Sequence, residues 1–181
     1  MKNIKAFLYT FLLWIIVGVI TKVMFCLMYL GDYSVADWMQ VMRHGVRLDI
    51  SISGYITMVT GLLLIVGIWW KGKAMGWIRA IWSGIAALVC SLGYVSNLVL
   101  YGYWRFPLDN TPLLYIKTSP ADAMASMTTA QMVLVPIVII AVAALLFLPQ
   151  WWIWRSLEKE KTPRRESLGK RIITAVVMLL L

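Results

Sequence analysis

The chain contains one histidine, His44, and two cysteines, Cys26 and Cys90. A structural zinc site needs about four Cys or His ligands at suitable spacing, so zinc coordination is excluded. Both cysteines fall inside apolar runs, which indicates small packing residues and no disulfide framework. Ser51, His44 and Asp49 could formally form a catalytic triad, but triads are recognised by geometry and these three are only close in sequence. The sequence therefore assigns no catalytic residue and no metal ligand.

Charge is also scarce, since charged residues make up 14% of the chain and only eight of them are acidic. No two carboxylates share a helix face, no β-strand pattern occurs, and no glycine-rich phosphate loop follows a strand. With so few His, Cys and acidic side chains, an enzyme acting within the membrane is the least expected class of function.

Apolar residues, in contrast, make up 61% of the 181 residues, and the mean hydropathy is +0.80. A soluble domain of this size could not cover so much apolar surface, which indicates a bilayer as solvent. Because a spanning helix needs about 20 apolar residues, the sequence predicts helices at 6–29, 48–70, 75–103 and 129–154. A fifth apolar segment, 172–181, is too short to span. The expected fold is all-α, a polytopic membrane helix bundle forming a single transmembrane domain over 1–181. The first run is too long for a signal peptide, and no small-x-small cleavage site follows it.

The net charge of +9 raises the possibility of nucleic-acid binding, but the distribution of charge argues against it. Positive residues on short loops mark the cytoplasmic side of a membrane protein. Twelve lysines and arginines lie before the first predicted span or beside two alternate loops: Lys2, Lys5, Lys71, Lys73, Arg79, Arg155, Lys159, Lys161, Arg164, Arg165, Lys170 and Arg171. This pattern predicts a membrane protein with a cytoplasmic N-terminus, membrane lipids as partners and no nucleic acid.

Two segments of the outer loops are expected to form short amphipathic helices. Ser34-Val35-Ala36-Asp37 has the form of a capping box, and the apolar residues that follow have helical spacing up to Val46. This predicts a surface helix over 34–46, with Trp38 and the methionines in lipid or on the bundle. Ser119-Pro120-Ala121-Asp122 predicts a second surface helix over about 120–127.

The few polar residues near the outer interface permit two interpretations each. Lys22 can extend its stem to the headgroups, which is slightly favoured, or pair with Asp49 at a similar depth. Arg47 and Asp49 can satisfy each other, and Asp109 belongs to the same structural polar cluster. The functional interpretation is a lipid-headgroup site, because cations beside interfacial aromatic residues suit a phosphate. Its candidate residues are Arg43, His44, Arg47, Arg105, Lys117 and Trp104.

Two stretches carry a family resemblance. Residues 44–56, HGVRLDISISGYI, resemble the first outer loop and second helix of lipoteichoic-acid-synthase-like proteins, and residues 101–120, YGYWRFPLDNTPLLYIKTSP, resemble their second outer loop. The order and spacing of the helices also agree over nearly the whole chain. The resemblance is closest to versions from Bacteroides-like bacteria, which are often labelled sulfatases.

The resemblance implies a five-helix membrane domain followed by an extracytoplasmic domain of the alkaline phosphatase and sulfatase type. That second domain carries a nucleophilic threonine and a divalent metal, often manganese, and transfers phosphoglycerol or a related phospho-alcohol from a lipid. The chain stops within the fifth helix, so it is expected to be the membrane anchor, and a possible lipid-presenting domain, of such a transferase, without cofactor or catalytic residues of its own. The alternative expectation is a small membrane scaffold or transporter subunit with no enzymatic role.

Overall fold

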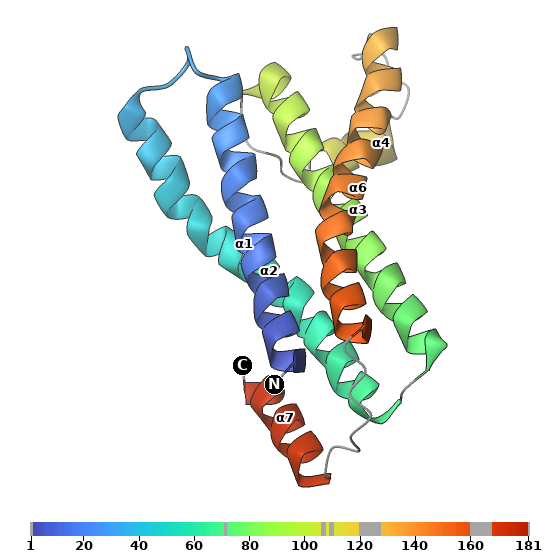
Figure 1. Cartoon of the computed structure of the whole chain (residues 1–181). Helices are drawn as coiled ribbons and strands as arrows, with labels where there is room; N and C mark the ends of the chain where they lie inside the picture. The colour runs from blue at the N-terminus through green and yellow to red at the C-terminus, as the bar shows by residue number, and fades with distance from the viewer. Residues whose placement is uncertain are drawn as a thin grey trace. The chain divides into compact units, whose positions relative to one another are not determined.

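Helices make up nearly all of the chain that can be described. The computed structural model describes residues 2–70, 72–105, 108, 111–119, 128–159 and 168–180. Helix accounts for 92% of these described residues, and no strand occurs among them. In chain order the helices are α1 (Lys2–Met28), α2 (Val35–Trp69), α3 (Lys73–Trp104), α4 (Thr111–Thr118), α6 (Thr129–Lys159) and α7 (Leu168–Leu180), as Figure 1 shows. The predicted all-α fold class is confirmed.

The helices α1, α2, α3 and α6 are long and apolar enough to cross a membrane. Even α1, with 27 residues, is roughly 40 Å long, more than the ~30 Å hydrocarbon core of a bilayer. All four expose large apolar side chains, among them Leu12, Leu62, Leu88 and Leu145. So much apolar surface is stable in lipid and unfavourable in water. These features are those of a multi-pass membrane protein, as predicted.

The structure differs from the prediction at the start of α2. The capping box is confirmed, because the Ser34 side chain accepts a hydrogen bond from the Asp37 N–H and the Asp37 carboxylate accepts one from the Ser34 N–H. The expected separate surface helix over 34–46 is wrong, however, since the helix runs unbroken from Val35 to Trp69. Gly45 is the only weak helix former near the expected break, and one glycine costs only about 1 kcal/mol. Nothing else in this stretch ends a helix.

The remaining predictions of helices agree within a few residues or cannot be compared. Helix α7 begins at Leu168, four residues before the expected fifth segment at 172. In the second predicted outer loop the structure describes α4, which was not expected. The surface helix predicted over 120–127 lies outside the described residues.

The chain divides into two compact units, residues 1–83 with 149–181 and residues 84–148. The expectation of a single transmembrane domain stays a prediction. In the first unit, α1 and α2 lie side by side and are connected near Gly31, and α7 contacts both helices (Figure 1). We call the end of this pair near Gly31 the hairpin end. At the opposite end, Ala6, Leu64 and Trp154 form a buried apolar cluster.

Polar contacts complete the opposite end of the first unit. The Trp154 indole N–H donates to the Ser83 hydroxyl at 2.8 Å, and the Arg79 guanidinium lies 5.3 Å from the centre of the Trp154 ring. This is the geometry of a cation–π interaction, which is strengthened where water is excluded. The buried Ser83 thus joins α3 to α6 within this unit.

In the second unit, α3 and α6 are joined by two side-chain hydrogen bonds. The buried Ser91 hydroxyl donates to the Ile139 carbonyl at 2.6 Å, and the Gln131 amide donates to the Tyr103 hydroxyl. Thr128 and Gln131 form a capping box that starts α6. Small residues such as Ser91 allow helices to approach closely in lipid.

Candidate functional site at the α1–α2 interface

The most unusual feature of the first unit is an ion pair between Lys22 on α1 and Asp49 on α2. The Lys22 and Asp49 side chains are 14% and 9% exposed. Both residues lie within helices long enough to span a membrane. Charge inside such helices is rare, costly and usually paired or functional. The structure therefore selects the pairing of Lys22 with Asp49 over the snorkelling that was slightly favoured from the sequence.

The direction of the Asp49 side chain also decides between Asp49's two candidate partners. Arg47 lies two residues before Asp49 on the same helix, and side chains two apart do not face each other. Arg47 is exposed and Asp49 is 8% exposed, which places them on different faces of α2. The alternative in which Arg47 neutralises Asp49 is therefore wrong.

Two glycines make room for the ion pair in a reciprocal way. A Cβ atom added to Gly18 on α1 would lie 2.5 Å from the Asp49 Cγ and 2.9 Å from the Asp49 Cβ. A Cβ atom added to Gly45 on α2 would lie 2.5 Å from the Lys22 Cδ. Real Cβ atoms do not approach other atoms this closely, so each charged side chain lies against bare backbone of the opposite helix.

This arrangement follows from antiparallel pairing in a single register. Gly18 precedes Lys22 by four residues on α1, and Gly45 precedes Asp49 by four residues on α2, which is one helical turn in each case. In two antiparallel helices, each charged residue can then lie opposite the glycine of the other helix. The matched spacing of the two glycine–charge pairs is the sequence signal that could have predicted the ion pair.

Farther from the hairpin end, α1 and α2 carry small polar residues that are buried. Thr10, Ser53, Thr57 and Thr60 are at most 2% exposed. The three threonine hydroxyls donate to backbone carbonyls four residues earlier, which satisfies them within their own helices. The Ser53 hydroxyl is among the described buried groups that have no hydrogen-bond partner. Small polar residues of this kind are typical of packing between membrane helices.

Three of the predicted headgroup residues lie close together on α2. Arg43, His44 and Arg47 are all exposed and lie within four positions near the hairpin end. Two like charges four residues apart on a helix destabilise it by about 0.2–0.5 kcal/mol, unless an anion neutralises them. Asp49 is already paired with Lys22. The two arginines thus leave an excess of positive charge on this turn.

The other predicted site residues belong to the second unit or lie outside the description. Arg105 follows α3 and is exposed, with a φ of 58°. Its N–H donates to the Tyr101 carbonyl at 2.9 Å, which closes α3 with a left-handed residue at a position that favours glycine. Lys117 is exposed in the last turn of α4. Trp104 is the last residue of α3, but its side chain lies outside the description, as does Asp109.

Among the described residues, no group of three or more His, Cys, Asp or Glu side chains could hold a metal ion. Compared with known proteins, the chain matches no family model, no curated protein and no solved structure. Its resemblance to lipoteichoic-acid-synthase-like proteins therefore stays a prediction based on the two sequence stretches.

Proposed function

We propose that the chain is the membrane anchor and lipid-presenting domain of a lipoteichoic-acid-synthase-like transferase of the sulfatase family. The sequence stretches 44–56 and 101–120 support the family. The observation that carries the lipid role is the positive turn of α2, where Arg43 and Arg47 are exposed while Asp49 is occupied by Lys22. Guanidinium groups bind phosphate through paired hydrogen bonds, so this turn suits a phospholipid headgroup.

In this proposal the chain supplies no reacting group. A catalytic domain following the fifth helix would carry the threonine nucleophile and a divalent metal, expected to be manganese. It would take the phospho-alcohol from lipid held at the membrane surface. The chain would lie in a bacterial inner membrane with its N-terminus in the cytoplasm, as the distribution of lysine and arginine indicates.

Labelling of single cysteines tests this orientation. With Cys26 and Cys90 replaced by serine, a cysteine at Gly31 or Thr118 is expected to react with a membrane-impermeant maleimide in intact cells. A cysteine at Lys73 is expected to react only after the membrane is opened. All three positions are exposed. The opposite pattern would reverse the orientation and remove the proposed family with it.

Turnover of lipid tests the proposed function. The gene sequence beyond Leu181 is expected to encode several hundred residues with a sulfatase-like pattern. In that longer protein, Arg47→Gln is expected to lower transfer from a phospholipid donor by about tenfold, the equivalent of one charge-assisted hydrogen bond. Hydrolysis of a water-soluble phosphodiester should stay unchanged, because the α2 turn would contact only the membrane-bound donor.

Lys73→Gln is the matched control, since Lys73 is an exposed cation at the start of α3. Equal loss of both activities in an Arg47→Gln protein that is still folded would contradict a role in presenting lipid. An immediate stop codon after Leu181 would contradict the transferase altogether.

The buried ion pair favours a second candidate, a small membrane scaffold or transporter subunit. Transporters bury charge between helices along the path of a substrate or ion. Lys22 and Asp49 are the corresponding groups here. Uptake of a solute by vesicles that contain the chain alone, abolished by Asp49→Asn, would favour this candidate over the anchor.

A further inference from the structure

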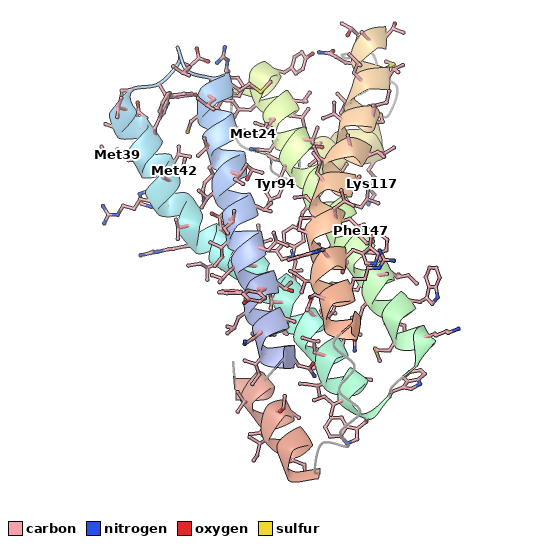
Figure 2. The ribbon with its side chains drawn as sticks, viewed as in Figure 1. Met24, Met39, Met42, Tyr94, Lys117 and Phe147 are labelled. Atoms are coloured by element: carbon pink, nitrogen blue, oxygen red, sulfur yellow. The ribbon has the colours of Figure 1, made fainter. Side chains whose placement is uncertain are left out.

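A groove of about 690 Å³ lies between the last turns of α1 and the first turns of α2. Cys26 and Val23 line it from α1, and Trp38, Met39, Met42 and Arg43 line it from α2. Figure 2 labels Met39 and Met42 on the part of α2 that lies opposite the end of α1. The groove exists because α2 begins at its capping box, well beyond the ion pair, and so extends along the last turns of α1.

The lining of the groove is almost wholly apolar. Among the described residues that line it, Arg43 is the only charged one and none is acidic. Methionine side chains are flexible and polarisable, so they adapt to an apolar guest of variable shape. An occupant that fits this lining has a long apolar part, and its charge, where it has one, is negative.

Arg43 identifies the charged part of the occupant. An arginine binds a phosphate through paired hydrogen bonds, and Arg43 lines the groove together with the apolar side chains. An apolar chain and an anion must therefore occur close together in the occupant.

We propose that the groove binds one acyl chain of an anionic phospholipid. Arg43 binds the phosphate. This inference rests on the proposed function only in identifying the bound lipid with the lipid that the domain presents. The competing occupant is a second copy of the chain, which the experiment below distinguishes from a lipid.

Native mass spectrometry of the 181-residue chain tests the proposal. Delipidated protein in detergent is offered equal amounts of phosphatidylglycerol and phosphatidylcholine. One phosphatidylglycerol should be retained under activation that removes all other lipid. Arg43→Gln should lower the occupancy of phosphatidylglycerol by about tenfold and should also narrow the preference over phosphatidylcholine.

Filling the groove tests the acyl chain separately. Val46 also lines the groove, so Val46→Trp should displace the lipid although Arg43 remains. Leu48→Trp is the matched control, because Leu48 is exposed and lies outside the groove. Lys73→Gln is the control for the loss of a cation. Should Val46→Trp lower the melting temperature, Val23→Phe fills the groove from α1.

Three outcomes would overturn the proposal. Full occupancy of phosphatidylglycerol in Val46→Trp, where the groove is filled, would show that only the headgroup binds. Loss of the lipid in Val46→Trp, with the lipid occupancy of Arg43→Gln unchanged, would show a non-specific shell of lipid. A dimer that Val46→Trp dissociates would show that a second copy occupies the groove. None of these results depends on transferase activity, so the proposed function can fail or hold independently.

Discussion

Replacing Asp49 with leucine is expected to lower the free energy of unfolding by about 3 kcal/mol, at the low end of the range for breaking a buried ion pair. The change leaves the Lys22 ammonium between two helices without its partner. Because the Lys22 side chain is 14% exposed, it regains some hydration, which keeps the loss from being larger. Thermal unfolding in detergent, followed by circular dichroism, measures the change.

The double variant Lys22→Met/Asp49→Leu separates the ion pair from its surroundings. Removing both charges leaves no unpaired group, so the double variant should recover most of the lost stability. A double-mutant cycle with Lys22→Met then gives the coupling energy of the pair. An unchanged melting temperature in Asp49→Leu would mean that water solvates Asp49 and that the pair does not stabilise the helices.

Substituting alanine for Gly18 is expected to destabilise the protein by about 1–3 kcal/mol, the usual cost of overpacking. The new methyl group would overlap the Asp49 side chain up to its Cβ atom, which cannot move without its helix. Gly45→Ala should cost less, because the Lys22 stem that it meets is long and flexible. Thermal unfolding in the same detergent ranks the variants.

Gly54→Ala provides the control on α2. A Cβ atom at Gly54 has no atom within 4 Å, so this change should be neutral or stabilise the helix by up to about 1 kcal/mol. If Gly18→Ala and Gly54→Ala had the same effect, the close approach of α1 to Asp49 would not exist in the folded protein.

The continuous α2 shows where pattern recognition from sequence fails. The capping box at Ser34 is local chemistry and predicts the start of the helix correctly. The expected break before Leu48 was inferred from a change in polarity between the amphipathic and apolar stretches. A change in polarity along a helix alters which of its side chains face water and which face lipid. It leaves the backbone hydrogen bonds intact, so α2 continues without a break. The same error concealed the groove, because a separate surface helix would not lie along α1.

The sequence by itself determined the all-α fold, the four long apolar helices and the capping box at Ser34, because these depend on composition and on hydrogen bonds between near neighbours. It also placed Arg43, His44 and Arg47 on one short stretch. Only the tertiary structure decided that Lys22 pairs with Asp49 and that Trp38 and Arg43 line one groove. Those contacts depend on the rotation and register of α1 against α2. The rotation and register follow from the bare backbone at Gly18 and Gly45, which allows each charge to reach across to the other helix.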